Sequence, residues 1–262
     1  MPAARHRTFA TAALAAAATL LTTTPALAQP AGPAAPALLR APLLRPDGDA
    51  HQSGPHDGRA NGTSVNWAGY AATGTTFTSV SASWTQPEAK CTSEDTYSSF
   101  WVGLDGDGSR SVEQNGSSAD CVGGRPQYYA WFEMYPAFPV VYKDKVEAGD
   151  RFTASVTATT AGKFTLTISD ETQHWSHVQH KSLSGAKPAS AEVIAEAPST
   201  QRGPLPLTDF GTAAFTDATV NGRPIGEFGP ENITMADRDG TVLASTSPLT
   251  AGKDFGVTWH HA

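Results

Sequence analysis

The feature that most limits the fold of this chain is a succession of short segments with the composition of β-strands. Val, Thr, Phe, Tyr and Trp are concentrated in the runs FTSVSASWTQP, SSFWVGLDG, QYYAWFEMYPA, RFTASVTATT, KFTLTISD and AEVIAEAPS, as is typical of strands. Several runs alternate: Phe152, Ala154, Val156 and Ala158 point one way and the hydroxyl residues between them the other. Asn-Gly and Asp-Gly turns separate the runs, and no window sustains a helical period. The sequence therefore predicts an all-β domain, either a sandwich or a barrel.

The first 60 residues do not share this pattern. Residues 1–28 combine two arginines, an apolar run and the small-residue ending Ala26-Leu27-Ala28, the three parts of a secretory signal peptide. The apolar run is shorter than the ~20 residues that span a membrane. Residues 29–60 are rich in Pro, Ala and Gly and cannot bury enough surface to fold alone, so they are either a propeptide of a secreted zymogen or a disordered linker. Residues 61–262 have the length of one domain.

This domain is acidic. The whole chain has 18 Lys and Arg residues against 25 Asp and Glu residues. Five of the basic and three of the acidic residues precede residue 61, which leaves the domain with a net charge of −9. An acidic domain without a basic run is unsuited to nucleic acid, and protonation of its carboxylates in acid relieves their mutual repulsion. We expect a protein that works in acid, without a nucleic-acid partner and without membrane contact once the signal is cleaved.

Cys91 and Cys121 are the two cysteines of the chain. In an exported protein a disulfide between them is the default expectation, and it would close the loop that carries Gln114. Two cysteines cannot form a four-ligand zinc site. The run HWSHVQH does not form one either, because residues three apart in a strand point to opposite faces. We expect no metal and no cofactor.

Aromatic segments of the domain also contain polar residues that a strand does not need. Three of them are NWAGY (66–70), FWVGLDGDGSRSVEQNG (100–116) and YYAWFEMYP (128–136). In the third segment, alternation puts Trp131 and Glu133 on one face. In a fourth segment, AEVIAEAPS, Glu192 and Glu196 share a face. A carboxylate among aromatic rings is either a solvated strand residue or part of a substrate-binding site.

The order of these segments resembles that of the glutamic peptidases, also called eqolisins. The fragments NW-G, WVG-DGD, EQ-G, AW-E-YP and AE-I-E follow one another within residues 64–260, so the likeness covers most of the domain. The resemblance implies a secreted acid endopeptidase built as a sandwich of two antiparallel β-sheets, of the concanavalin or jelly-roll type, that acts as a monomer on polypeptides. It makes Gln114 and Glu196 the catalytic residues. The residues it implies in substrate binding are Trp67, Trp101, Asp105, Trp131 and Glu133.

The chemistry of Gln114 and Glu196 suits peptide hydrolysis. A glutamate can take a proton from water as a general base and return it as a general acid. A glutamine has no proton to exchange near neutral pH, but its amide offers two N–H donors that can stabilise an oxyanion. Three differences from the familiar fungal members concern the surroundings of the pair. Tyr129 stands where they have Asp, the link from DGD to Gln114 is one residue shorter, and Ala197-Pro198-Ser199 replaces an acidic run.

Two other functions stay open on the residues alone. A glycoside hydrolase on a similar sandwich would use Glu133 and Glu196 as its two carboxylates. A non-catalytic carbohydrate-binding module would stack its tryptophans on sugar rings. Without the resemblance, Gln114 is best explained as a strand-end residue bonded to backbone. Protein hydrolysis at low pH, release of reducing sugar and binding without turnover distinguish the three functions.

Overall fold

The computed structural model describes residues 62–262 except for 110, 161, 201 and 202. The predicted signal peptide (1–28) and the predicted propeptide or linker (29–60) lie outside the described residues. Among the described residues, the regular secondary structure is almost entirely strand. In chain order the elements are β1 (Gly62–Ser64), β2 (Trp67–Ala72), β3 (Ser79–Thr85), β4 (Ser99–Leu104), β5 (Val112–Val122), β6 (Arg125–Tyr135), β7 (Val140–Val141), β8 (Arg151–Thr160), β9 (Lys163–Asp170), β10 (Trp175–Ser182), β11 (Ala191–Glu196), β12 (Ser199–Thr200), β13 (Gly203–Pro204), β14 (Thr212–Val220), β15 (Arg223–Pro224), the short 3-10 helix η3 (Ile225–Phe228), β16 (Glu231–Ala236), β17 (Val242–Thr246) and β18 (Phe255–Trp259).

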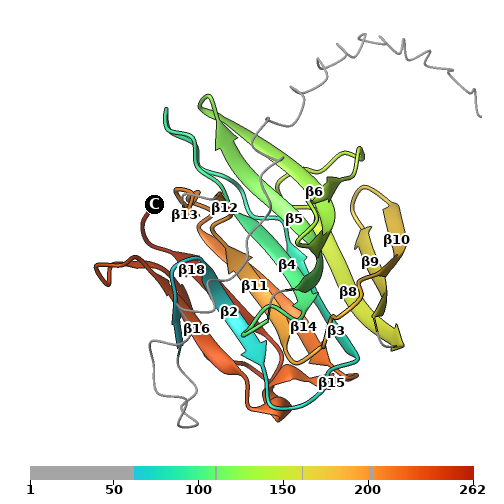
Figure 1. Cartoon of the computed structure of the whole chain (residues 1–262). Coiled ribbons are helices and arrows are strands. Elements are labelled where there is room, and N and C mark those ends of the chain that lie inside the picture. Colours follow the sequence, from blue (N-terminus) through green and yellow to red (C-terminus); the bar gives the residue numbers. More distant parts are fainter. Residues whose placement is uncertain (1–61, 110, 161, 201–202) are drawn as a thin grey trace, which may run out of the picture. The chain divides into compact units, whose positions relative to one another are not determined.

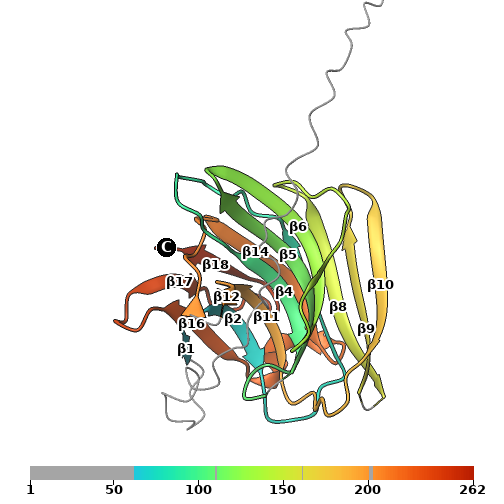
Figure 2. The same cartoon turned by 45° about the horizontal axis from the view of Figure 1, so that its top comes forward.

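Within the described residues, sixteen strands share one hydrogen-bonded network that folds over itself into two layers (Figure 1). Fourteen of them follow the order β10-β9-β8-β3-β14-β18-β17-β16-β2-β11-β4-β5-β6-β7, and each neighbouring pair in this order is antiparallel. The other two lie off this path: β1 pairs with β16 and β15 pairs with β14. We call β2, β11, β4, β5 and β6 layer A, and β10, β9, β8, β3, β14 and β18 layer B. Strand β4 lies over β8 and β3, β5 over β9 and β8, and β11 over β3 and β14 (Figure 2). The predicted sandwich of antiparallel sheets is confirmed.

The main core lies between the two layers. From layer B it takes the apolar residues of β8, Phe152, Ala154 and Val156, as the alternation predicts. From layer A it takes Phe100 and Val102 of β4, together with alternate residues of β2, β11 and β6. The opposite side of layer B is partly exposed, so its strands show an alternating pattern of burial. This is the usual arrangement for a strand with one face on the core and one on solvent.

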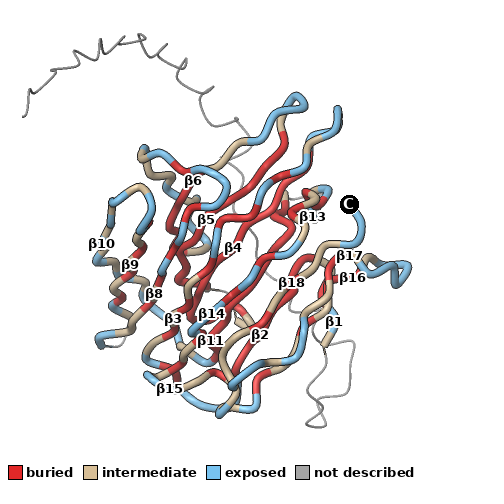
Figure 3. The backbone as a smooth tube through the Cα atoms, turned by 180° about the vertical axis from the view of Figure 1, so that it is seen from behind, coloured by how far each residue is buried: buried red, intermediate tan, exposed pale blue. Residues whose placement is uncertain are grey.

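Layer A differs because its second face is buried too. Every residue of β2, β4 and β11 is buried, as the unbroken red tube of these strands in Figure 3 shows. A second cluster, separate from the main core, covers this face with Trp67, Trp101 and Trp131. Gly116 makes room for it, because a Cβ there would lie 2.2 Å from the carbonyl oxygen of Phe100 and 2.6 Å from Cβ of Trp101. A close approach of this kind requires glycine.

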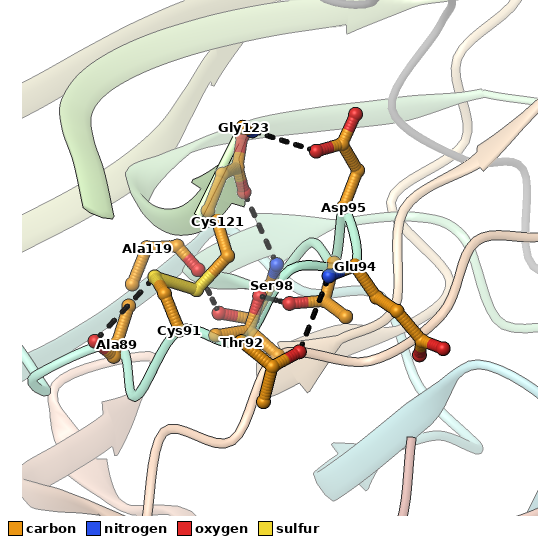
Figure 4. Close-up of a disulfide and its surroundings, with 12 residues drawn as sticks. Ala89, Cys91, Thr92, Glu94, Asp95, Ser98, Ala119, Cys121 and Gly123 are labelled. Atoms are coloured by element: carbon orange, nitrogen blue, oxygen red, sulfur yellow. Dashed lines mark hydrogen bonds between the residues drawn. A yellow bond between two sulfur atoms is a disulfide. The ribbon is translucent and has the colours of Figure 1, made fainter. Parts of the chain in front are cut away.

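The predicted disulfide is also confirmed. Cys91 and Cys121 are bonded, with their Cα atoms 5.3 Å apart and a sequence separation of 30 (Figure 4). Cys121 lies near the end of β5, and Cys91 lies in the segment that follows β3. Backbone hydrogen bonds between Thr96 and Cys121 also join the segment after β3 to β5. The bridge therefore joins the end of a layer A strand to the chain leaving layer B.

Candidate active site

The second face of layer A, which we call the outer face, brings together most of the residues singled out in the sequence. Residues directly opposite one another in an antiparallel pair point to the same side of a sheet, so the strand register defines rows across β2, β11, β4, β5 and β6. The three rows are Trp67, Glu196, Ser99, Ser118, Tyr129; then Gly69, Ile194, Trp101, Gly116, Trp131; then Ala71, Glu192, Gly103, Gln114, Glu133. Six of the seven residues that the resemblance assigns to catalysis or substrate binding lie in these rows.

Glu196 is the last residue of β11 and is fully buried. Its two carboxylate oxygens each accept a hydrogen bond: Oε2 from Nε1 of Trp101 at 2.7 Å, and Oε1 from Nδ2 of Asn66 at 3.2 Å. Asn66 is itself held, because its Oδ1 accepts a hydrogen bond of 3.1 Å from the Ser64 hydroxyl. The same hydroxyl accepts the backbone N–H of Trp67 at 3.1 Å. Glu196 therefore has a fixed orientation, set by donors from β4 and from the start of β2.

Gln114 and Glu133 form a direct pair on the same face. They are opposite each other in the β5–β6 register, and Nε2 of Gln114 donates to Oε2 of Glu133 at 2.6 Å. Both side chains are fully buried. Among the described residues, neither Oε1 of Gln114 nor Oε1 of Glu133 has a hydrogen-bond partner. Burial raises the pKa of Glu133 well above its usual range, and the nearby charge of Glu196 raises that pKa further.

The tryptophans and Tyr129 are held by hydrogen bonds as well as by packing. Trp67 and Trp101 meet edge to face with ring centroids 5.0 Å apart. Nε1 of Trp131 donates to the Ser118 hydroxyl at 3.0 Å. The Tyr129 hydroxyl donates to Oδ2 of Asp120 at 2.7 Å, and burial raises the pKa of Asp120 to about 7. The outer face thus combines rigid aromatic surfaces with buried carboxyl groups, an arrangement able to hold a peptide and exchange protons with it.

A model of the peptidase A4 family matches residues 65–259, about three quarters of the chain. The chain belongs to the peptidase A4 family. Aspergillopepsin-2 of Aspergillus niger is 29% identical over 234 residues, which cover 77% of this chain and 81% of that protein. The structure of aspergilloglutamic peptidase from Aspergillus niger aligns with a TM-score of 0.56 at 28% identity, over 63% of this chain and 99% of that one. Scytalido-glutamic peptidase, solved with a transition state analog inhibitor, has the same fold, with a TM-score of 0.65 at 24% identity over 75% and 98% of the two chains.

This A4 peptidase is therefore a glutamic-type endopeptidase, as the order of its sequence fragments predicts. Its relatives do not favour the glycoside hydrolase or the carbohydrate-binding module. In the part of the chain that the structure describes, no group of three or more His, Cys, Asp or Glu side chains is placed to hold a metal ion. Nor does any helix among those residues have the length and apolar character needed to cross a membrane.

Asp105, the seventh residue implied by the resemblance, does not lie in the rows of the outer face. It follows β4 with a φ of 62° and is fully buried. Its carboxylate accepts the backbone N–H groups of Lys187 and Ala189 at 2.9 and 3.1 Å and the hydroxyl of Ser111 at 3.1 Å. These contacts fasten the loop before β11 to the turn between β4 and β5. In this structure, the contacts of Asp105 support the strands that carry Glu196 and Gln114.

Glu192 shares the outer face with Glu196 but has different partners. Its Oε1 accepts the backbone N–H of Asp107 at 3.4 Å. Burial raises its pKa well above the usual range of a glutamate. Glu192 therefore faces the turn after β4, whereas Glu196 is held by Trp101 and Asn66 at the other end of β11.

Sequence reasoning missed Asn66, Ser118 and Asp120. Asn66 precedes β2, where strand alternation does not apply, and its one signal is its position beside Trp67. Ser118 and Asp120 were missed because the polar segment after Gln114 does not look like a strand. It forms β5, the 11-residue strand in which Asn115-Gly116, a typical turn dipeptide, lies extended. The physical reason is the close approach of Phe100 and Trp101 at Gly116, which tertiary packing imposes.

Proposed function

We propose that Gln114 and Glu196 are the catalytic pair of a peptidase that works in acid outside the cell. The observation that carries the proposal is the arrangement of the outer face. Glu196 is oriented by Trp101 and Asn66, and Gln114 lies on the same face with its amide bonded to Glu133. The pair thus supplies a fixed carboxylate and a fixed amide dipole on one rigid sheet. Preorganised groups of this kind need no rearrangement as charge develops.

The reaction follows from the chemistry of these two side chains. The oxygen of a water molecule attacks the peptide carbonyl carbon while the carboxylate of Glu196 takes a proton from that water. The carbonyl oxygen becomes an oxyanion and accepts a hydrogen bond from an N–H of Gln114. Glu196, now protonated, gives its proton to the amide nitrogen, and the carbon–nitrogen bond breaks. The products are a carboxylic acid and an amine, and Glu196 is again ionised.

This mechanism favours an acidic working range. Glu196 must be ionised to accept a proton and protonated to return it, and an ordinary glutamate titrates near pH ~4.3. The neighbouring carboxyls Glu133, Glu192 and Asp120 all have a raised pKa. In acid these three groups are therefore neutral, which removes the repulsion between them and Glu196.

Polypeptides are the substrates, and the chain acts on them as a secreted monomer. Trp67, Trp101 and Trp131 form a wide apolar cluster on the outer face, beside the two catalytic side chains, against which a peptide would pack. The signal-like residues 1–28 support export, and residues 29–60 are removed when the zymogen matures. N-terminal sequencing of secreted, fully active protein tests this maturation, and a mature chain that begins at Gln29 would make residues 29–60 a linker.

The decisive experiment compares three variants on a protein substrate at acid pH. Glu196→Gln keeps the shape of the side chain and removes the base, so kcat/KM should fall by about 10²–10⁴-fold. Gln114→Ala removes the oxyanion donor and should cost about 10²–10³-fold. Glu192→Gln is the matched control on the same strand, and its loss should be much smaller. Thermal midpoints close to that of the wild type show that the loss is chemical.

Each alternative outcome of this experiment has a definite meaning. Near-normal turnover by Glu196→Gln would rule out the proposed mechanism. Release of reducing sugar by the wild type, abolished by Glu133→Gln, would replace it with the two-carboxylate hydrolase. Inhibitors of serine and cysteine peptidases and metal chelators should have no effect, because the mechanism uses none of those groups.

A further inference from the structure

Glu133 is a buried carboxyl that the reaction of Gln114 and Glu196 does not consume. It faces Gln114 directly across β5 and β6, and the 2.6 Å hydrogen bond between them is made where neither side chain is exposed to water. The position of the Gln114 amide therefore depends on what Glu133 presents to it.

A glutamine amide has two orientations that exchange its oxygen and its nitrogen. With Nε2 on Glu133, the second N–H of Gln114 remains for an oxyanion, and Oε1, which has no partner among the described residues, remains for the attacking water. In the reversed orientation a carbonyl oxygen would take the place of the N–H and would repel an oxyanion. Glu133 selects the useful orientation as long as Oε2 carries no proton, because an unprotonated Oε2 accepts the N–H and would repel a carbonyl oxygen, whereas a proton on Oε2 would favour the reversed orientation.

We propose that Glu133 is a positioning residue that fixes the amide of Gln114, and that it does so as a neutral carboxylic acid. This inference rests on the proposed catalytic role of Gln114 and Glu196. The proton lies on Oε1, because Oε2 is the acceptor of the Gln114 N–H. Glu133 does not touch the reacting atoms in this account, and it acts through Gln114.

The neutral form follows from the charges that the reaction creates. A carboxylate behind the amide would oppose the oxyanion in front of it, and a second negative charge near ionised Glu196 in a buried site is costly. Burial and the charge of Glu196 both favour the protonated form of Glu133, which is the direction of its raised pKa. The titratable side chains that share the outer face with Glu133 are Glu192 and Glu196 on β11, Asp120 on β5, Tyr129 and Tyr135 on β6 and Glu231 on β16. None of these side chains is basic, so no cation among the described residues of this face favours an ionised Glu133.

The test uses two variants of similar size in the mature enzyme. Glu133→Gln keeps a carbonyl acceptor for the Gln114 N–H and cannot ionise. Glu133→Met keeps the volume and removes the acceptor. We expect Glu133→Met to lower kcat by about 10²-fold, the effect of losing one oxyanion donor, with KM changed by less than about threefold. Glu133→Gln should recover kcat to within about tenfold of the wild type, since it restores the acceptor.

The pH dependence of kcat/KM is the second measurement, and a merely structural role of Glu133 would leave it unchanged. In the wild type, kcat/KM should fall on the high-pH side of the profile as Glu133 ionises. In Glu133→Gln this upper limb of the profile should move to higher pH by at least about one pH unit. Circular dichroism at each pH limits the comparison to folded protein. If Glu133→Met does not fold, the profile of Glu133→Gln decides alone.

The remaining outcomes separate this inference from the proposed function. A Glu133→Met variant with a kcat close to that of the wild type would show that Glu133 does not position Gln114. A Glu133→Gln variant as inactive as Glu133→Met, or one with an unchanged upper limb, would show that the neutral acid is not the working form. Either result together with an inactive Glu196→Gln overturns only the inference. An active Glu196→Gln overturns the proposed catalytic pair itself.

Discussion

The two layers of the sandwich use the same strand geometry in different ways. In layer B, strands β3, β8 and β9 bury one face against the core and carry mainly hydroxyl side chains on the other. Ser83 and Thr153 are 2.9 Å apart across β3 and β8, and Ser81 and Thr219 are 2.7 Å apart across β3 and β14. In layer A, both faces are buried, and the outer one carries carboxyls and tryptophans. An alternating sequence is therefore enough to specify the strands of layer B. In layer A, the orientation of the buried polar side chains also depends on specific partners.

The two layers are also expected to respond differently to pH. Hydroxyl groups, which are the main polar groups on the exposed face of β3, β8 and β9, do not titrate in the range where carboxyls do. Layer A holds buried carboxyls whose pKa values are raised by burial, and these groups fit the fold best when they are protonated. Stability and activity are thus both expected to respond to pH through layer A.

Of the changes considered for the two layers, removing the disulfide should lower the free energy of unfolding the most. The Cys91–Cys121 bridge closes a loop of about 30 residues, for which chain-entropy arithmetic gives roughly 3–4 kcal/mol. The double variant Cys91→Ser with Cys121→Ser should lose about that much unfolding free energy, as measured by urea denaturation at acid pH. A loss below about 1 kcal/mol would mean that the unfolded chain is already restrained in this region.

Adding a methyl group should distinguish the crowded layer from the tolerant one. Gly116→Ala in β5 places a Cβ 2.2 Å from a backbone oxygen that cannot move without its strand. We expect a loss of about 3 kcal/mol, at the upper end for overpacking. In the matched variant Gly256→Ala in β18, the atom nearest to the new Cβ is Cγ2 of Thr212 at 3.3 Å, and the substitution should cost less than about 1 kcal/mol. Equal midpoints of the two variants in denaturant would contradict the claim that layer A is the more tightly packed.

A smaller effect should appear as a pH dependence of stability. Glu113 of β5 is fully buried, and burial together with the charge of Asp105 raises its pKa from 4.5 to about 8. Between these values the unfolded chain has released the proton and the folded chain retains it. Stability should therefore fall as pH rises from about 4.5 to about 8. Asp120, with its pKa raised to about 7, acts in the same direction.

Denaturation midpoints measured across this pH window test the role of Glu113. Glu113→Gln cannot ionise, so its stability should fall less steeply with pH than that of the wild type. Thr157→Val on the exposed face of β8 is the control, and its slope should match the wild type. A wild-type stability that increases toward neutral pH would show that the buried carboxyls of layer A do not behave as described.

Sequence reasoning succeeded where one periodic pattern determines the structure. The alternation of β8 placed Phe152 and Val156 in the core, and that of β6 placed Trp131 and Glu133 together on the opposite face. The pairing of Cys91 with Cys121 followed from there being two cysteines in an exported chain. In each of these cases local sequence and final structure agree, so little three-dimensional information was needed.

The rest of the site depends on contacts between distant segments. The hydrogen bond from Asn66 to Glu196 joins residues 130 positions apart, and neither side chain signals it. Strand β5 is polar along much of its length, because one of its faces lies in the site and Gly116 admits the backbone of β4. The resemblance to glutamic peptidases located Gln114 and Glu196, while the partner of Gln114 became visible only in the register of β5 with β6.

The central claim, that Gln114 and Glu196 act together in one step, is tested most directly by a double-mutant cycle. It compares kcat/KM of the wild type, Gln114→Ala, Glu196→Gln and the double variant on one peptide substrate at one acid pH. If the two side chains serve the same transition state, the double variant should be within about tenfold of the worse single variant, because residues that act as a unit are not additive. If the two losses simply multiply, the residues act independently and the account of a catalytic pair is wrong.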